Sequence, residues 1–390
     1  MEAWSVHTLY QEAKAAHGNE VAADLQGYAT QLRNSGLPVI FSLKHLAKIT
    51  QVDYKVLHDT VARRRESANY RMFPIKKRSG GRRFVHAVSG NLLLIQKFIN
   101  TLILKQRNLH PCSYAFHSSG GIRKCAAQHC GAKWLFQYDL ENFFYSVDEI
   151  DVYRIFRQFG YRNLLSFELA HLCTTTHLPK HIEMKFRYRK DFDLCNEIKV
   201  PYRIGGDGKH VGVLPQGAPT SPMLSNIAAE KLDIQLYKFA IENGLVYTRY
   251  ADDLTFSARD LSKKVSIGEI HRQIISVIRR CHFRENVKKI RIAGPGSKKI
   301  VLGLLVDGEE PRISKEMYHR IDRHLYAALK FGLAETAKHE GFDSSYGFYN
   351  HTHGLICYVK DVDTARWNEF NIRFSRITPP LEDNLIGGFL

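Results

Sequence analysis

The sequence predicts an α+β protein of two or three subdomains, and three observations support this. Its 390 residues are enough for a large core divided in this way. Runs of β-branched and aromatic residues, which are typical of strands, flank short polar or glycine-containing turns. Other segments repeat apolar residues at helical spacing.

The charge balance indicates the class of partner. Lysine and arginine number 56 against 39 aspartates and glutamates, which gives a formal net charge of +17. Such a surplus predicts a polyanionic partner. Nucleic acid is favoured over an anionic membrane, because no apolar run approaches the roughly 20 residues that span a bilayer and the N-terminus lacks a signal-peptide core. The seven cysteines are scattered and never spaced C-x-x-C, so we expect a reduced, cytoplasmic protein without disulfides or zinc.

Basic residues gather in three clusters. Arg63, Arg64 and Arg65 form the first, which alone is typical of a solvated helix face. The second is "KKRSGGRR", residues 76–83, where Gly80 and Gly81 separate the strand-like runs "YRMFPIKK" and "RRFVHAV". This pattern predicts a β-hairpin with lysine and arginine on both arms, suited to gripping phosphates. The third contains Lys288, Lys289, Arg291, Lys298 and Lys299.

An acidic residue follows the apolar run "WLFQY". Asp139 stands where that strand should end, either as a turn former or as a functional carboxylate. Further along, the glycine-containing loop "LPQGAPTSP" precedes a helix that we expect to run from Ser221 to Gly244, capped by Thr220 or Ser221. A helix start after such a loop favours anions such as a triphosphate. The apolar residues of the expected helix are Leu224, Ile227, Ala228, Leu232, Leu236 and Phe239.

Two adjacent carboxylates lie in "VYTRYADDLTFS", residues 246–257. Paired aspartates in an exposed loop are commonly just solvated. Here the flanks are strand-like, so Asp252 and Asp253 are expected at a hairpin tip. If the hairpin is buried, the two charges repel and lose hydration unless a cation neutralises them. Together with Asp139 they predict a site for two Mg²⁺ ions, with Mn²⁺ as the alternative, and for phosphoryl transfer.

The order of these motifs resembles that of reverse transcriptases, and more narrowly that of the bacterial retron-type enzymes. "YDLENFFYSV", "LPQGAPTSP" and "YADD" are similar to the first three palm motifs, and "NVKKIRI" and "VLGLLVDG" to the two that follow. "IKKRSGGRRFVHAVS" resembles the fingers segment that holds the nucleotide, and "IFSLKHLAKITQVDYKVLHDTV" the N-terminal helical region. Retron enzymes typically carry Asn-Ala-x-x-His and Val-Thr-Gly. Here Cys125 replaces the asparagine in "CAAQH" and Leu302 replaces the threonine in "VLGLL".

The resemblance implies a right-hand polymerase fold with fingers, a palm made of an antiparallel sheet with helices, and a helical thumb. We expect residues 1–135 to form the N-terminal helical region and fingers, 136–310 the palm, and 311–390 the thumb. Within the palm we expect an insertion, residues 177–212, to which the sequence assigns no function. In the thumb, "SKEMYHRIDRHLYAALKFGLAETAKH", residues 314–339, predicts a helix with Met317, Ile321, Leu325 and Leu329 on its apolar face.

The resemblance also implies roles for single residues. Asp139, Asp252 and Asp253 would be catalytic and, with Leu140, would hold the metals. The incoming dNTP would meet Lys76, Arg82, Arg83, Phe144 and Gln216, with Arg83 preferred over Arg82 as the fingers arginine and Phe144 as the aromatic gate against ribonucleotides. Expected nucleic-acid contacts are Arg63, Arg64, His129, Tyr250, Lys288, Lys289, Arg320, Arg323, Tyr346 and Tyr349. For His129 and the tyrosines, core packing is the alternative.

The implied activity is RNA-directed DNA synthesis. A retron enzyme would copy part of its own structured noncoding RNA, which serves as template and primer, into a covalently linked RNA–DNA hybrid (msDNA). It would do so within an anti-phage system that can include an effector or toxin protein. The alternatives are other defence-associated or group II intron-like reverse transcriptases, although we expect no maturase or endonuclease extension. An inactive RNA-binding scaffold is a further alternative, but it has no physical need of three clustered carboxylates.

Overall fold

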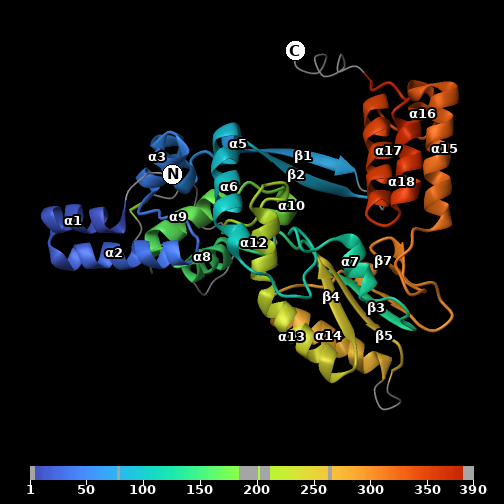
Figure 1. Ribbon diagram of the computed structural model, residues 1–390, viewed down its shortest axis with the longest axis horizontal. Helices are drawn as coiled ribbons and strands as arrows, with labels where there is room; N and C mark the ends of the chain where they lie inside the picture. The colour runs from blue at the N-terminus through green and yellow to red at the C-terminus, as the bar shows by residue number, and fades with distance from the viewer. Residues whose placement is uncertain (1–4, 77–79, 184–200, 203–210, 262–265, 381–390) are drawn as a thin grey trace.

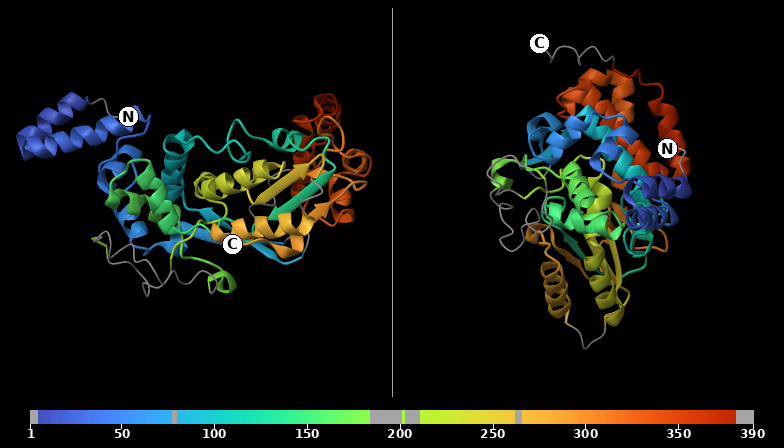
Figure 2. Two further views of the ribbon diagram at one scale, coloured as in Figure 1. Left: turned by 90° about the horizontal axis from the view of Figure 1, so that it is seen from below. Right: turned by 90° about the vertical axis from the view of Figure 1, so that its left-hand side faces the viewer.

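The N-terminal region is helical and is followed by a long hairpin. The computed structural model describes residues 5–76, 80–183, 201–202, 211–261 and 266–380. Helices α1 and α2 form an antiparallel pair that projects from the rest of the molecule (Figure 2). Strands β1 and β2 pair from Tyr70 with Val88 to Lys76 with Arg82, and Gly80 and Gly81 both adopt positive φ, so the predicted hairpin is confirmed in the described residues. The elements are α1 (Val6–His17), α2 (Asn19–Asn34), α3 (Leu43–Thr50), α4 (Tyr54–Val61), α5 (Glu66–Asn69), β1 (Tyr70–Lys76) and β2 (Arg82–Val88).

A four-stranded antiparallel sheet in the order β4-β5-β3-β6 forms the centre of the molecule. Side chains alternate between its two faces. Tyr138, Tyr247 and Phe256 on one face are buried in a core shared with α13 and α14, whereas Leu135 on the other belongs to a second core. The strands are β3 (Trp134–Asp139), β4 (Val246–Tyr250), β5 (Asp253–Ala258) and β6 (Arg291–Ala293).

Helices pack around this sheet and join it to the N-terminal region. Helices α8, α9 and α12 share the larger core with residues of α2, α3, α4 and α6. The bounds are α6 (Gly90–Leu102), η1 (Leu104–Gln106), α7 (Ile122–Ala127), α8 (Glu149–Gln158), α9 (Asn163–Cys173), α10 (Lys180–Glu183), α12 (Ser221–Ala228), α13 (Glu230–Glu242), α14 (Ile267–Arg280) and η2 (Val287–Lys289).

The expected single helix over residues 221–243 is instead two helices. Helix α12 ends at Ala228 and α13 begins at Glu230, with Ala229 at φ −81° and ψ −1° between them. Thr220 occupies the N-cap position, as expected, but its side chain makes no capping bond, and the Ser221 hydroxyl donates to the Pro215 carbonyl (2.7 Å). The apolar spacing continues across the break, because Leu224, Leu232 and Leu236 are all fully buried.

The C-terminal bundle, residues 315–374, is a separate group of helices with its own core. That core extends to Leu135, to α7 and to the small β7–β8 ladder. The helix expected over residues 314–339 is instead two, α15 and α16, with Gly332 at φ +83° between them. In α15, Leu329 is exposed and Ala328 and His324 are buried in its place. The elements are β7 (Ile300–Val301), β8 (Leu304–Leu305), α15 (Lys315–Phe331), α16 (Leu333–His339), α17 (Ser345–Lys360) and α18 (Thr364–Phe374).

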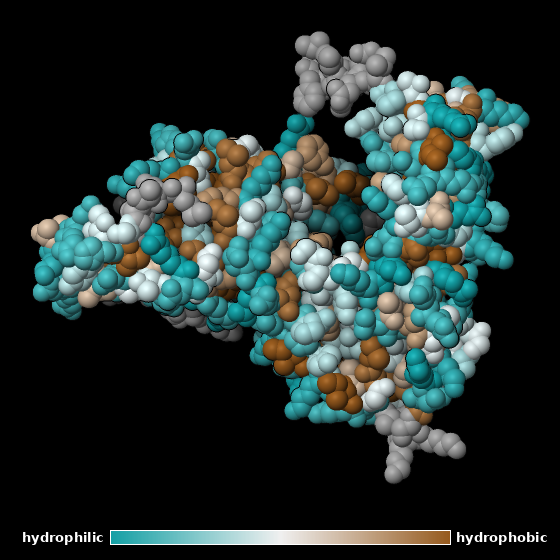
Figure 3. All heavy atoms as spheres, in the orientation of Figure 1, coloured by the Kyte–Doolittle hydropathy of each residue, from teal (hydrophilic) through white to brown (hydrophobic). Residues whose placement is uncertain are grey.

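The hairpin and the C-terminal bundle stand on opposite sides of a hollow above the sheet. The tip of β1–β2 points towards α17 and α18 (Figure 1), and the space-filling view is hollowed between them (Figure 3). Most of the insertion expected at 177–212 lies outside the described residues. Among the described helices, none is long and apolar enough to cross a membrane.

Candidate active site

Asp139 and Asp253 lie side by side on neighbouring strands. They are direct partners in the β3–β5 register, and a cross-strand pair shares one face of the sheet. That face is opposite the one covered by α14, where the Tyr138 hydroxyl contacts His271 Nδ1 (3.2 Å). The strand-end position predicted for Asp139 is confirmed.

Asp252 reaches the same place through a tight turn. Strands β4 and β5 are joined by Ala251 and Asp252 alone, and Ala251 has φ +55°, a left-handed conformation. Two bonds fix the turn: Arg249 Nη1 donates to the Ala251 carbonyl (3.2 Å), and the Leu140 amide donates to the Asp252 carbonyl (2.9 Å). The predicted hairpin tip is therefore confirmed, and its backbone is tied to the end of β3.

The three carboxylates interact electrostatically. Desolvation first, then the Asp252 and Asp139 charges, raise the pKa of Asp253 to about 7. Desolvation and Asp139 likewise raise the pKa of Asp252, and Lys289 and Arg83 oppose that shift. Although Asp253 as a whole is exposed, protein atoms surround its carboxyl group, so desolvation and the neighbouring charges both raise its pKa. Neighbouring basic residues thus neutralise this acidic site only in part.

Asp139 is contacted by two side chains from the segment that follows α14. Lys289 Nζ lies 2.5 Å from Oδ2, and Asn286 Nδ2 donates to Oδ1 at 3.1 Å. Lys289 is expected to contact nucleic acid, but in this structure it forms an ion pair with Asp139. Sequence reasoning missed Asn286, although its motif "NVKKIRI" was identified.

The donor set suits a divalent cation. No cluster of three or more metal-binding side chains is preformed in the residues the structure describes, where Asp139 is paired with Lys289. The carboxylates are nonetheless hard oxygen ligands that destabilise one another when ionised, which is the condition that Mg²⁺ relieves. Leu140 can contribute only its backbone carbonyl, because its side chain is apolar and buried.

A buried ion pair between Arg249 and Asp233 supports the turn between β4 and β5. Arg249 and Asp233 have 0% and 1% of their side chains exposed, and Arg249 Nη2 lies 2.6 Å from Asp233 Oδ2. Arg249 also donates to Asn226 Oδ1 (2.8 Å), and the Tyr247 hydroxyl donates to Asp233 (3.0 Å). Sequence reasoning missed this pair. The only available signal was the arginine inside an otherwise apolar strand.

The residues expected to bind nucleotide lie on elements that border the carboxylates. Arg83 is exposed on β2 and close enough to Asp252 to lower its pKa, while Lys76 and Arg82 form the last exposed pair of the hairpin ladder. Phe144 is half-buried with its ring 6.4 Å from that of Phe116, whereas Phe143 is only 3% exposed. The Gln216 carbonyl accepts a bond from the His86 amide (2.7 Å), which joins the loop to β2.

Two expected RNA contacts are wrong because their side chains are buried. Arg63 is 7% exposed and bonded to Glu66, Glu149 and Thr174. His129 is 1% exposed and lies 2.7 Å from both Thr248 Oγ1 and Ser257 Oγ, and burial lowers its pKa to about 3. A neutral histidine without a surface cannot contact a phosphate, so the alternative of core packing is correct for His129.

The other expected RNA contacts are at or near the surface. Tyr346 is 50% exposed, while Tyr349 packs against Phe374 with ring centroids 4.6 Å apart. On α15, Arg323 faces Glu340 at 3.5 Å and Arg320 lies 2.9 Å from His351 Nε2. Of the remainder, Arg64 and Lys288 are exposed and Tyr250 is half-buried.

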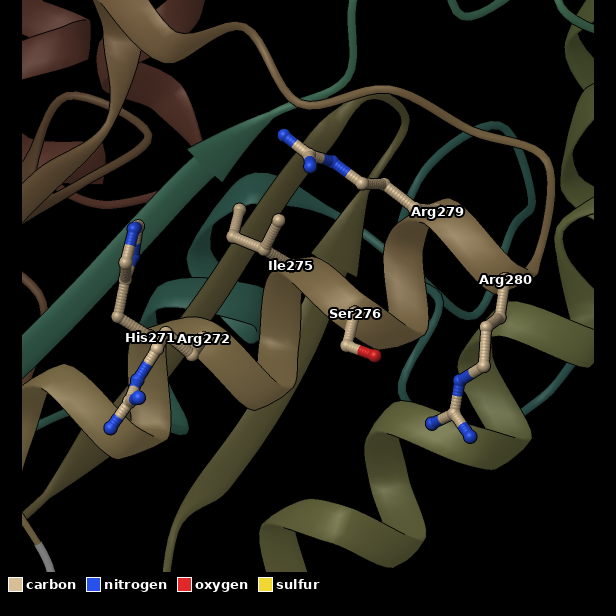
Figure 4. A pocket seen from close by; sticks show the side chains of 6 residues that line it. All are labelled: His271, Arg272, Ile275, Ser276, Arg279 and Arg280. Atoms are coloured by element: carbon tan, nitrogen blue, oxygen red, sulfur yellow. The ribbon is translucent and has the colours of Figure 1, made fainter.

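A basic hollow on α14 is not the reaction site. Its volume is about 570 Å³, and Figure 4 shows Arg272, Arg279 and Arg280 pointing in different directions around it. Arg279 forms an ion pair with Glu285. The hollow lies on the helix that covers the opposite face of the sheet, so the carboxylates do not line it.

Comparison with known proteins agrees with the site. The family model described as reverse transcriptase (RNA-dependent DNA polymerase) matches residues 75–304, more than half of the chain. The Retron Ec86 reverse transcriptase of Escherichia coli is 28% identical over 336 residues, covering 86% of this chain and 88% of that protein. The Retron Mx65 reverse transcriptase of Myxococcus xanthus is 30% identical over 366 residues, covering 92% of this chain and 77% of that protein. Both similarities include the segments that carry the carboxylates.

Proposed function

The chain belongs to the bacterial retron-type reverse transcriptases and is an RNA-directed DNA polymerase, and we propose that it copies part of its own structured noncoding RNA into a covalently linked RNA–DNA hybrid. The substrates are dNTPs, and the RNA is both template and primer. The observation that carries this proposal is the pairing of Asp139 with Asp253 beside Asp252, with incomplete neutralisation by neighbouring basic residues.

Each proposed site residue has a distinct part in nucleotide addition. Asp139, Asp252 and Asp253, with the Leu140 carbonyl, hold two Mg²⁺ ions. When bound, these ions supply Lewis-acid stabilisation for the attacking and leaving oxygens. Arg83, with Lys76 and Arg82, neutralises the triphosphate. Phe144 excludes a 2′-hydroxyl, and Gln216 lines the nucleotide pocket.

The regions described above correspond to a right hand. Residues 1–135 act as N-terminal region and fingers, 136–310 as palm and 311–390 as thumb. The molecule is hollowed between the β1–β2 hairpin and the C-terminal bundle (Figure 3), which supports a template–primer duplex above the sheet. Exposed basic and aromatic side chains then contact nucleic acid, among them Arg64, Lys288, Arg320, Arg323 and Tyr346.

A catalytically inactive scaffold is the less favourable function. Such a protein would retain Asp252 and Asp253, whose pKa values are raised by desolvation and by neighbouring carboxylate charges and which give no folding benefit. Among active enzymes, the similarity to retron proteins over most of the chain favours self-templated synthesis over the intron-like and other defence-associated reverse transcriptases. An anti-phage role in the cytoplasm, with an effector protein, belongs to this proposal.

The test is recovery of the product with the protein. The chain is expressed with its neighbouring locus and purified, and the bound nucleic acid is digested separately with ribonuclease and deoxyribonuclease. We expect a species whose electrophoretic mobility changes with both nucleases, and its absence from Asp252→Asn. Bound RNA without DNA in the wild type would overturn self-templated synthesis.

A further inference from the structure

Arg63 occupies an unusual position at the end of α4. Its backbone has φ +60°, in the left-handed region, and only 3% of its side chain is exposed. The guanidinium donates to Glu66 Oε1 (3.0 Å), Glu149 Oε2 (2.6 Å) and the Thr174 carbonyl (2.6 Å). A buried cation with two carboxylate partners is a specific arrangement, because each charge left unpaired would be strongly unfavourable.

Glu149 and Glu66 each bond to one of two chain segments that pair with each other. One segment contains Gly212 and leads to the Gln216 loop, and the other contains Thr175. Glu149 Oε2 accepts from the Gly212 amide (2.9 Å), and the Glu149 amide donates back to the Gly212 carbonyl (2.8 Å). Glu66 accepts bonds from the Thr175 hydroxyl and from the Thr176 amide (3.2 Å). Thr175 and Val213 in turn exchange backbone bonds at 2.9 and 3.0 Å.

These segments lead directly to both walls of the proposed nucleotide pocket. Glu149 begins α8, immediately after the turn that contains Phe144, and the Val147 amide donates to the Phe144 carbonyl (3.2 Å). The Val147 carbonyl accepts from the Leu214 amide (3.1 Å), two residues before Gln216. The Phe144 turn and the Gln216 loop are therefore bonded to each other beside Glu149.

We propose that Arg63 is a positioning residue that fixes the spacing between Phe144 and Gln216, and through it the affinity for dNTP and the rejection of ribonucleotides. This proposal rests on the proposed function. Arg63 belongs to the N-terminal helical region and touches neither substrate nor metal. It acts through Glu149 and Glu66, which carry the bonds to the two chain segments.

Gly212 provides a second way to disturb the same contact. A methyl group at this position would overlap the Arg63 guanidinium and stand 2.6 Å from Glu149 Oε2. Gly212→Ala therefore displaces the cluster of Arg63, Glu66 and Glu149, here called the clamp, while all its charges remain. Arg63→Gln instead removes the cation and leaves the two carboxylates unpaired. If Arg63→Gln fails to fold, Gly212→Ala still decides the question.

The experiment measures single-nucleotide extension of one primer–template with dGTP and with GTP. We expect Arg63→Gln and Gly212→Ala to raise the KM for dGTP about tenfold, and to lower the dGTP-over-GTP ratio of kcat/KM about tenfold, since small displacements of a positioning contact have effects of this order or larger. Arg63→Lys should lie between them and the wild type. The control is Arg272→Ala, because Arg272 is 74% exposed, pairs with Glu269 at 2.6 Å and lies on α14, which covers the face of the sheet opposite the carboxylates.

A purely structural role for Arg63 gives a different result. It would lower thermal stability and the active fraction, but the KM and the dGTP-over-GTP ratio of that fraction would equal the wild-type values, and this outcome would overturn the proposal. If the wild type does not extend a primer, the proposed function fails instead. The positioning role of Arg63 is then tested by the Kd of dGTP in a complex with a chain-terminated primer. Equal Kd values in wild type and Gly212→Ala would reject that role.

Discussion

Asp233 on helix α13 and the three carboxylates around the β4–β5 turn form two acidic groups that differ in how their charge is compensated. Asp233 is completely buried and has its cation within the chain, since Arg249 lies 2.6 Å away. Asp139, Asp252 and Asp253 lie on the other side of the same hairpin and share Lys289 and the more distant Arg83. Desolvation, and then the charges of Asp252 and Asp139, which the basic residues offset only in part, raise the pKa of Asp253 to about 7.

The comparison separates charges that hold the fold together from charges that serve the reaction. A buried pair such as Asp233–Arg249 positions the turn and is complete without any ligand. The carboxylates at the turn remain repulsive until a divalent cation arrives. Substitutions in the two groups should therefore affect different measurements.

The largest expected effect is on catalysis. Asp252→Asn or Asp253→Asn should lower the rate of nucleotide addition by about a thousandfold or more, because the loss of one charged ligand weakens the metal site while side-chain volume is conserved. The free energy of unfolding in the absence of metal should be unchanged or higher, since a repulsive charge has been removed. Single-turnover extension and urea unfolding measure the two quantities. Near-normal extension by both variants would rule out this assignment.

Asp233→Asn should show the opposite pattern. It leaves Arg249 buried and unpaired, so the free energy of unfolding should fall by about 3–5 kcal/mol. The folded fraction should keep its Mg²⁺ requirement. Asp260→Asn is the matched control, because Asp260 is 80% exposed and its pair with Lys133 should contribute less than about 1 kcal/mol. Equal stability of the two variants would remove the distinction between the charge groups.

The two adjacent phenylalanines test the boundary between core and site. Phe143 is 3% exposed, so Phe143→Ala should destabilise the fold by roughly 3–5 kcal/mol through a large cavity. Phe144 is half-buried, and Phe144→Ala should chiefly admit ribonucleotides while dNTP incorporation continues. The dGTP-over-GTP ratio of kcat/KM is the measurement. A folded Phe144→Ala enzyme with the wild-type ratio would show that the gate is elsewhere.

A smaller effect is expected from Glu168, a buried carboxylate that accepts a hydrogen bond from the Tyr202 hydroxyl. Burial raises its pKa to about 7. Because the folded pKa lies above the unfolded one, the contribution of Glu168 to stability is largest below about pH 4.5 and declines until about pH 7. Glu168→Gln should remove this decline and be more stable than the wild type at pH 8 by roughly 2 kcal/mol. Parallel stability–pH curves for the two proteins would contradict the shift.

Local patterns in the sequence were sufficient to predict the elements that carry Asp139, Asp252 and Asp253. Each of these elements is determined by residues close together in the sequence. The signals are the alternation around Asp252 and Asp253, the apolar run before Asp139, and the paired glycines at 80 and 81. The apolar spacing predicted helix α15 in the same way, but not its end at Phe331 before α16.

Ion pairs and hydrogen bonds between residues far apart in the sequence could not be predicted. A run of three arginines is typical of an exposed face, and the burial of Arg63 depends on Glu149, which is 86 residues away. His129 likewise depends on Thr248 and Ser257. The break at Ala229 has no glycine or proline to mark it, because tertiary packing rather than propensity determines where α12 ends.

The most direct test of this account is the effect of Mg²⁺ on thermal unfolding. Mg²⁺ should raise the unfolding midpoint of the wild type, because it binds the folded state at carboxylates that the chain leaves incompletely compensated. Asp233→Asn should start from a lower midpoint and show a similar increase, whereas Asp252→Asn and Asp253→Asn should show little or none. An equal increase in all four proteins would contradict the claim that these aspartates form the metal site.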